Sequence, residues 1–528
     1  MNLFELLNKR FSFVVIAITL FIVYSLYFYQ SNYFVDGEMM AGDNWEYQSM
    51  AVNFAKGHGI HKCGGLEPFE TYKFVRGEPH RIDSYMKMNF YGFTREPGTP
   101  LFAGLIYKMV GIYPIVVKKV QFFMMIFIAA FLPWIGYKFY GKTGFFAGLI
   151  GGPIFFLNIY MYTLSLLTES LITFSAFLIT VSFIFYENKK NILTSAFIGF
   201  CIAIALLIKS LFTFVPILVF IYFGWQFWKT RQKSYIYQGI ALFAVLIITI
   251  LPWSIYASAR SDKNITIVHP DRSYIVALHA NNEFCEKGAM FDQWQGKNEA
   301  FYNNDGMEGK SAMLRVVNFY IHHPQLILKY PRYKFIAGFF PMFFLWVILV
   351  VLAIDAYGAL LNKYFKSKLY LKLWWIISIP FAVWLLVYLY RSIDPFYTPE
   401  FNDRMQNLMD TNFFWLFLAL CLPIFLVRRS TQLEMPVVFQ ILFYSFIGII
   451  VITLVNTGDK RFVNPINMIF VITGINYVIK YSMFVVENFG FKFSLSNVAN
   501  LSDKNQKKIK NTQKQDKHIV TNKSKVKK

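Results

Sequence analysis

Long apolar runs dominate the pattern of hydrophobic and polar positions along the chain. A run of about twenty residues can cross a bilayer core of about 30 Å as an α-helix. The runs do not alternate apolar with polar positions, which excludes a membrane β-barrel. They predict an all-α polytopic protein with about twelve transmembrane helices. The predicted spans are 11–30, 120–140, 145–163, 167–186, 191–208, 211–228, 235–257, 334–356, 370–390, 411–427, 436–455 and 466–486.

Short basic connectors fall on alternate sides of the predicted membrane. They are Lys9/Arg10, Lys138/Lys142, Lys189/Lys190, Lys229/Arg231/Lys233, Lys363/Lys366/Lys368, Arg428/Arg429 and the C-terminal tail. Connectors rich in Lys and Arg remain in the cytoplasm, so both termini are expected there. The longer segments, about 31–119 and 258–333, then face outside as two large loops. We expect a multi-pass plasma (inner) membrane protein whose outer loops form a small layer of helices over a membrane cavity.

Composition supports a membrane domain at 1–490 and a separate tail at 491–528. Hydrophobic residues make up 56% of the chain and charged residues only 16%, against about 25% in soluble domains. No small-residue cleavage site follows the first run, which is expected to stay as a helix; an uncleaved signal anchor would look similar. The net charge is +22, and Leu501–Lys528 holds ten Lys and two Asp. Because this tail lacks aromatic residues, we expect a disordered cytoplasmic end that touches anionic lipid rather than nucleic acid.

The stretch "GDNWEYQSMA", directly after the first span, is the first candidate for chemistry. It places Asp43 and Glu46 beside the aromatic residues Trp45 and Tyr47, near the membrane plane. A carboxylate at this boundary can act as a general base where apolar surface raises its pKa. The alternative is that these acids are solvated loop residues.

The rest of the first outer loop extends the pattern. An Asp-x-x-Glu-Tyr-x-x-x-Ala segment is followed by Gly-x-Gly and then by "REPGTPLFAGLIYKMVG", which begins at Arg95. This order resembles the polyprenyl-phosphate-sugar transferases of the GT-C superfamily, which include protein O-mannosyltransferases and lipid A aminoarabinose transferases. The resemblance implies that Asp43 is the catalytic base and that Arg95 contacts the donor phosphate.

Further segments resemble the same family in the same order. Four matches give Glu169 in "LSLLTESLITF", Lys209 in "ALLIKSLFTFVP", Asn281 and Asn282 in "HANNEF", and Arg461 in "DKRFVNP". "LPWSIYASAR" departs from the family pattern, because Tyr256 stands where an Arg is usual and the nearest Arg is Arg260. Asn44 follows Asp43, so the paired Asp-Glu of the protein mannosyltransferases is absent. That departure weakens the case for a protein acceptor.

The resemblance also implies roles for the charged residues. Arg95, Lys209 and Arg461 would bind the donor phosphate, since cations stabilise the charge that develops on a phosphate leaving group. Glu169 would be a second catalytic carboxylate. Further donor or acceptor contacts are expected from Glu46, Tyr47, Arg260, Asn281 and Asn282. The alternatives are that the cations only snorkel to the interface and that Glu169 only complements a helix dipole.

We expect no metal and no cofactor. His58, His61 and His80 lie in the first loop without the spacing of a metal site. Cys63 and Cys285 fall in the two outer loops, where a disulfide and two free thiols are equally open.

The expected function is inverting transfer of a sugar from a polyprenyl phosphate to a lipid, glycan or protein acceptor outside the cytoplasm. The main alternative is a transporter or flippase of lipid-linked sugars, which the two long outer loops and the lack of internal repeats disfavour. A second enzyme alternative is a transferase similar to O-antigen ligases, which have a single large late loop. Neither the sugar nor the acceptor can be identified from the sequence.

Overall fold

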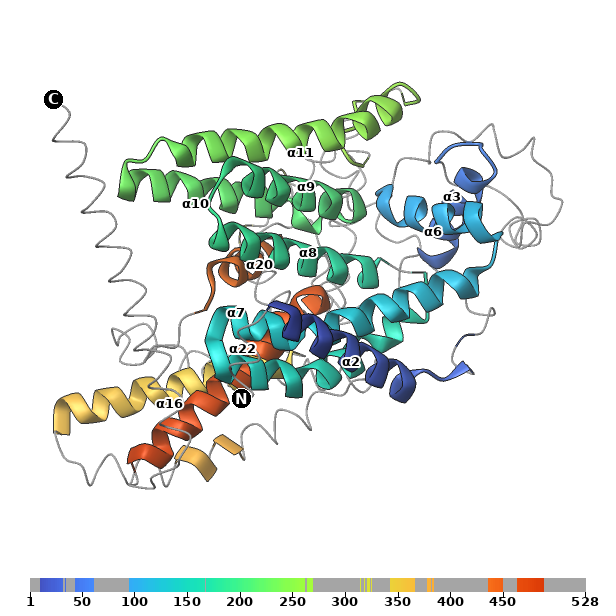
Figure 1. Ribbon diagram of the computed structural model, residues 1–528. Coiled ribbons are helices and arrows are strands. Elements are labelled where there is room, and N and C mark those ends of the chain that lie inside the picture. The colour runs from blue at the N-terminus through green and yellow to red at the C-terminus, as the bar shows by residue number, and fades with distance from the viewer. Residues whose placement is uncertain are drawn as a thin grey trace, which may run out of the picture.

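The computed structural model describes residues 10–31, 34, 43–60, 95–166, 168–261, 264–268, 314, 318, 321–322, 324, 342–365, 378–380, 382–383, 435–449 and 463–488. Every regular element in these ranges is helical, which confirms the predicted all-α class (Figure 1). The elements are α2 (Arg10–Phe28), α3 (Asp43–Ala55), α6 (Gly98–Val110), α7 (Pro114–Thr163), α8 (Glu169–Asn188), α9 (Ile192–Ile208), η4 (Ser210–Phe212), α10 (Phe214–Thr230), α11 (Ser234–Ser258), α16 (Phe343–Phe365), α20 (Val437–Ile447), η6 (Asn464–Ile466) and α22 (Asn467–Asn488).

Six helical segments in the described ranges are long and apolar enough to cross a membrane. They are Pro114–Leu164, Glu169–Asn188, Ser210–Thr230, Ser234–Ser258, Phe343–Leu361 and Asn464–Phe484. Three shorter apolar helices also coincide with predicted spans: Phe13–Phe28, Ile192–Ile208 and Val437–Ile447. These helices are consistent with a membrane protein. The predicted span 411–427 and most of 370–390 lie outside the described residues, so the count of twelve stays a prediction.

Helix α7 is a hairpin of two antiparallel arms. In a straight helix, residues eight apart are separated by about 12 Å. Here a Cβ atom added at Gly136 would lie 2.0 Å from the carbonyl oxygen of Gly144, and one at Gly148 would lie 2.3 Å from that of Leu132. The turn is made at Gly141, whose φ of 68° is sterically open to glycine. The two arms coincide with the separate spans predicted at 120–140 and 145–163.

Helix α16 differs from its predicted range. The predicted span was 334–356, whereas the helix is described from Phe343 and continues to Phe365. Asp355 and Gly358 lower the local hydropathy near the predicted end, but neither prevents helical hydrogen bonding. A hydropathy boundary therefore marks where the apolar character weakens, not where the helix stops.

The helices run alternately, so their ends form two groups. Phe127 lies 5.8 Å from Phe177 between ring centroids, and Trp134 lies 6.5 Å from Phe185, so the first arm of α7 is parallel to α8. Helices α8, α9, α10 and α11 lie side by side (Figure 1). Tyr186 Oη donates to Gln238 Oε1 at 2.7 Å, which ties the end of α8 to the beginning of α11. We call this the basic-turn end, because it carries the turns 138–142, 189–191 and 229–233.

The short helices α3 and α6 lie together at the opposite end of the bundle (Figure 1). They pack closely because glycine removes side-chain bulk: a Cβ atom at Gly104 would lie 2.8 Å from the Ala51 carbonyl oxygen. Gly98 brings α6 against the end of α9 in the same way, since its Cβ atom would lie 2.8 Å from the Cα atom of Ile208. We call this the α3–α6 end. Four of the predicted site residues, Glu46, Tyr47, Arg95 and Lys209, lie at this end.

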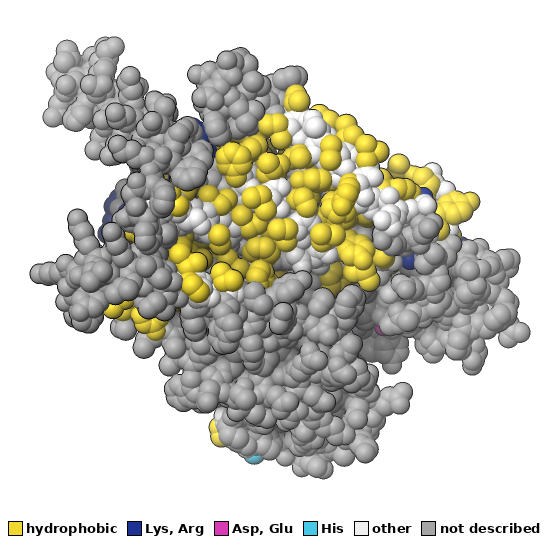
Figure 2. All heavy atoms as spheres, turned by 90° about the horizontal axis from the view of Figure 1, so that it is seen from below, with side chains coloured by type: hydrophobic (Ala, Val, Ile, Leu, Met, Phe, Trp, Pro, Cys, Tyr) yellow, Lys and Arg dark blue, Asp and Glu magenta, His cyan; other side chains and the backbone are white. Residues whose placement is uncertain are grey.

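The outside of the bundle is apolar. Hydrophobic side chains cover much of the described surface on the face seen from below, with few charged groups among them (Figure 2). Helices α10 and α11 expose Phe220, Ile221, Trp225, Trp228, Ile240, Ile247, Ile248 and Ile255. Exposed apolar surface of this extent is expected where lipid, rather than water, surrounds the helices.

Candidate functional site

Three chain segments bring charged side chains together at the α3–α6 end. The first turn of α3 supplies Glu46 and Tyr47, and the turn before α6 supplies Arg95 and Glu96. Lys209 lies where α9 stops, in extended conformation with φ −158° and ψ 130°. The interruption leaves the N–H group of Ser210, at the start of η4, free of an intrahelical acceptor, as at any helix start. The break between α9 and η4 thus supplies two polar groups of the site, the Lys209 side chain and the Ser210 N–H group.

Arg95 and Glu46 form the first pair of the cluster. Arg95 Nε donates to Glu46 Oε2 at 2.5 Å, and their side chains are only 13% and 12% exposed. The guanidinium carbon also lies 5.4 Å from the centroid of the Tyr47 ring, within the range of a cation–π contact. Arg95 is thereby fixed between a carboxylate and an aromatic face.

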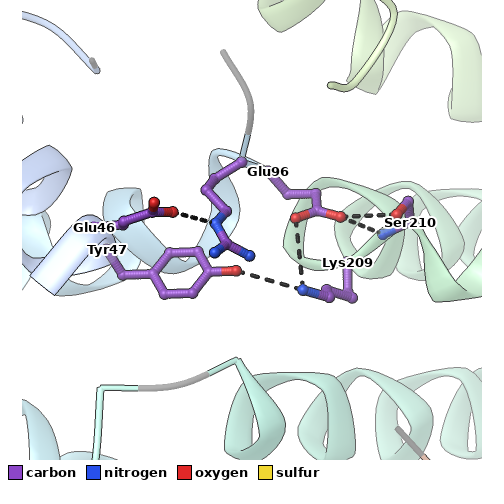
Figure 3. A network of polar contacts seen from close by, with 6 residues as sticks. Glu46, Tyr47, Glu96, Lys209 and Ser210 are labelled. Carbon is purple, nitrogen blue, oxygen red and sulfur yellow. Dashed lines mark hydrogen bonds and ion pairs between the residues drawn. The ribbon is translucent and has the colours of Figure 1, made fainter. Parts of the chain in front are cut away.

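Lys209 and Glu96 form the second pair, and Tyr47 joins the two (Figure 3). Lys209 Nζ lies 3.9 Å from Glu96 Oε2 and donates to Tyr47 Oη at 3.4 Å. Glu96 Oε1 accepts from the Ser210 backbone N–H at 2.9 Å and from the Ser210 hydroxyl at 2.8 Å. The carboxylate thus caps the start of η4 with one oxygen and faces the ammonium with the other.

Both members of the second pair are charged at neutral pH although they are buried. Burial alone would lower the pKa of Lys209, but Tyr47 and the carboxylates of Glu96 and Glu169 outweigh burial and raise it. Burial alone would raise the pKa of Glu96, but the charge of Lys209 and the hydrogen bonds from Ser210 outweigh burial and lower it.

The two cations are close enough to repel each other. The Arg95 guanidinium acts on Lys209 in the direction that lowers the pKa of Lys209, against the carboxylates. Two like charges that are both largely buried are unfavourable unless anions offset them. Glu46 and Glu96 supply these anions, one for each cation, and both cations lie beside Tyr47.

Several predicted site residues meet in this cluster. Arg95, Lys209, Glu46 and Tyr47 are in contact through the pairs above. Glu169 begins α8, is 3% exposed and acts electrostatically on Lys209. Its place at a helix start fits the interpretation that it complements the helix dipole, whereas its catalytic role stays a prediction.

Other predicted residues are not part of the described cluster. Asp43 is the first residue of α3, and its side chain lies outside the described residues; positions four apart share a helix face, so position 43 is on the face of Tyr47. Arg461, Asn281 and Asn282 also lie outside the described residues. The guanidinium carbon of Arg260 lies 4.1 Å from the Tyr256 ring centroid.

Sequence reasoning assigned no role to Glu96 or Ser210. Both stand directly beside predicted residues, in the dipeptides Arg95-Glu96 and Lys209-Ser210. Their neighbours in the sequence therefore pointed to this region. The hydrogen bond between Ser210 and Glu96, however, joins residues 114 positions apart and depends on the packing of α6 on α9.

Within the described ranges, no group of three or more His, Cys, Asp or Glu side chains is arranged to hold a metal ion. His58 is described and exposed, whereas His61, His80, Cys63 and Cys285 lie outside the described residues. The expectation of a site without metal stays a prediction.

No protein-family model, curated protein or solved structure matches the chain significantly. The interpretation of the site therefore depends on its residues and their geometry.

Proposed function

We propose that the chain is a GT-C-type membrane glycosyltransferase that moves a sugar from a polyprenyl phosphate to an acceptor at the extracytoplasmic face of the plasma membrane. In this proposal the α3–α6 end faces outside, the basic-turn end faces the cytoplasm, and about twelve helices span the membrane. The acceptor is a lipid, a glycan or a protein hydroxyl.

The observation that carries the proposal is the buried pair of cations at Tyr47. Arg95 and Lys209 are 13% and 14% exposed, and both contact the same tyrosine from different segments. A phosphodiester is an anion that two neighbouring cations can bind together. Arg is suited to phosphate because its planar guanidinium can donate two parallel hydrogen bonds.

The chemistry is a single displacement at the anomeric carbon. Asp43 accepts the proton of the acceptor hydroxyl, and the hydroxyl oxygen bonds to the anomeric carbon. The bond between that carbon and the phosphate oxygen breaks on the opposite face, so the configuration inverts. Polyprenyl phosphate leaves with one more negative charge, which Arg95, Lys209 and Arg461 stabilise. Glu169 orients the acceptor or restrains the cations.

The test is transfer by purified protein in lipid nanodiscs. The donors are polyprenyl phosphates carrying mannose, glucose, galactose, arabinose or aminoarabinose, and the acceptors are extracted membrane lipids, glycans and proteins. Mass spectrometry should detect free polyprenyl phosphate together with a glycosylated acceptor. Asp43→Asn should lower the rate about 100-fold or more, because it removes the base and keeps the shape.

Glu187→Gln is the matched control, because this carboxylate lies in the exposed pair at the basic-turn end. It should change the rate less than about twofold. An Asp43→Asn protein with near-normal turnover would exclude Asp43 and transfer the assignment to Asp36 or Glu38, two carboxylates that precede it in the same predicted outer loop. Movement of lipid-linked sugar across proteoliposomes without any product would instead identify a transporter or flippase.

A further inference from the structure

Several described side chains at the end of the bundle that holds the charged cluster carry buried polar atoms without hydrogen-bond partners. Gln121 on α7 is fully buried, and neither its amide nitrogen nor its amide oxygen has a partner. Gln48 Nε2 on α3 and Thr99 Oγ1 on α6 are also buried without partners, as is Asn44 Oδ1. Each such atom costs about 1–3 kcal/mol, so proteins keep few of them without a reason.

These atoms lie at the α3–α6 end. Gln48 follows Tyr47 in the sequence, and Thr99 lies one helical turn after Glu96. Val117, one turn before Gln121 on the same face of α7, packs in one apolar cluster with Tyr47 and Ala51. The parallel packing of α7 and α8 places Gln121 at the depth of the first turn of α8, which begins at Glu169. The wall formed by these groups therefore adjoins the cations.

The chemistry of the wall is neutral and mixed. Gln48 and Gln121 offer amide donors, whereas Asn44 and Gln121 offer carbonyl acceptors, and the Thr99 hydroxyl can do both. A sugar hydroxyl also donates and accepts, so a set of hydroxyls can satisfy such a mixture where a phosphate or an alkyl chain cannot. The charged carboxylates nearby already face Arg95, Lys209 and Ser210.

We propose that Asn44, Gln48, Thr99 and Gln121 form the hydroxyl-binding wall of the site, and that the glycosyl group they recognise is uncharged. This inference rests on the proposed function and extends it: the cations hold the phosphate of the carrier, while the amides select the sugar. Gln121 is the central residue, because it is the one described side chain with two orphaned buried atoms.

The matched control is a second buried glutamine, Gln238 on α11. It is 3% exposed, accepts from Tyr186 Oη and donates to the Lys190 carbonyl oxygen. Replacing a satisfied amide with Leu should destabilise the fold, whereas replacing an orphaned one should relieve a penalty. Gln121→Leu should therefore raise the melting temperature of the ligand-free protein in detergent, and Gln238→Leu should lower it.

Binding separates the two parts of the site. The probes are short-chain polyprenyl phosphate without sugar and the same carrier with mannose, glucose, galactose, arabinose or aminoarabinose. Wild type should bind one neutral-sugar carrier about tenfold tighter than the bare carrier, as one or two well-formed hydrogen bonds to a ligand would give. Gln121→Leu should abolish this preference and leave the affinity for the bare carrier unchanged, whereas Lys209→Met should weaken both.

Five outcomes would overturn the inference. A Gln121→Leu protein that keeps the sugar preference would exclude the wall, as would a lowered ligand-free melting temperature. Tightest binding of the aminoarabinose carrier would contradict an uncharged sugar. Wild type that binds the bare carrier without any sugar preference would refute the wall and leave the phosphate site intact. Binding of no carrier at all would refute the proposed function itself, and the wall with it.

Discussion

The two ends of the helical bundle carry charge in opposite ways. At the α3–α6 end, the pairs Glu46–Arg95 and Glu96–Lys209 are almost enclosed, with side chains between 6% and 14% exposed. At the basic-turn end, Lys190 and Glu187 are 41% and 44% exposed, and their atoms are 3.1 Å apart, a separation between those of the two enclosed pairs. The two ends therefore differ in how far their ion pairs are buried, not in how close the paired atoms are.

This difference distinguishes charged side chains that are exposed to solvent from charged side chains that are buried together in a candidate site. Exposed ion pairs contribute about 0–1 kcal/mol, and their fields are screened by salt. Burial of charge is unfavourable in itself and is rarely the most stable solution for a fold. A protein that keeps four such groups together at one end, joined through Tyr47, is expected to use them. The basic turns need only orient the chain in its membrane.

Removing the Lys of one ion pair at each end should give the largest difference in stability and in carrier binding. Lys209→Met leaves Glu96 buried without its ammonium, so unfolding in detergent should become easier by about 3–5 kcal/mol, and carrier binding should be lost. Lys190→Met should change stability by less than about 1 kcal/mol. Chemical denaturation with a binding assay measures both. Equal effects at the two ends would contradict the comparison.

Replacing a glycine with alanine on α6 and on α10 should give the next largest difference in stability. The Cβ atom of Gly98→Ala would lie 2.8 Å from the Ile208 Cα atom, and the strain should cost about 1–3 kcal/mol and displace Arg95 from Lys209. Gly224 on α10 has no atom within 4 Å of the added position, so Gly224→Ala should be neutral or stabilising by up to about 1 kcal/mol. Melting temperatures decide between these outcomes, and a harmless Gly98→Ala would show that α6 does not need this close approach.

Acid should weaken the α3–α6 end through Glu96. Its folded pKa is lowered from the ordinary value of 4.5, so its contribution is fully present above that pH and is lost as the pH falls through the folded pKa. The pKa of Lys209 is raised from 10.5, so its contribution is lost only as the pH rises above that value. The stability difference between wild type and Glu96→Gln should be constant from about pH 5 to 9 and should shrink below. A difference that stays constant to pH 3 would show that the Glu96 charge contributes nothing.

Removal of residues 500–528 should have the smallest effect. The tail is polar and rich in Lys, a composition from which we expect little burial, and the proposed topology places it across the membrane from Asp43. Truncated protein should transfer sugar within about twofold of the full chain. A collapse of turnover in folded protein would mean that the tail reaches the site or that the sidedness is inverted. Labelling a single tail Cys in intact cells with an impermeant reagent distinguishes these two cases.

The sequence predicted the helices better than it predicted the contacts. Apolar length determines where a helix can cross a membrane, so the two arms of α7 could be separated from sequence, and Lys138 and Lys142 marked their turn. The end of α16 was misplaced because hydropathy falls at Asp355 before the helix does.

For the site, Arg95 and Lys209 were indicated by the resemblance to the GT-C transferases, together with the expectation that cations near span ends are costly unless they snorkel or are paired. The roles of Glu96 and Ser210 were not predictable, because they depend on how Gly98 lets α6 approach Ile208. Gln121 could not be recognised either: a lone Gln in an apolar run gives no sign of whether its amide finds a partner inside the bundle.

The most direct test of the central claim, that the buried cations hold an anionic carrier, is the affinity of bare polyprenyl phosphate for an Arg95 series. Wild type should bind most tightly, Arg95→Lys should be weaker because the forked guanidinium is lost, and Arg95→Ala should be weakest because the charge is lost as well. Hydrogen bonds between charged groups contribute about 1.5–3 kcal/mol, so wild type and Arg95→Ala should differ by about tenfold or more. Equal affinities across the three folded proteins would contradict the claim.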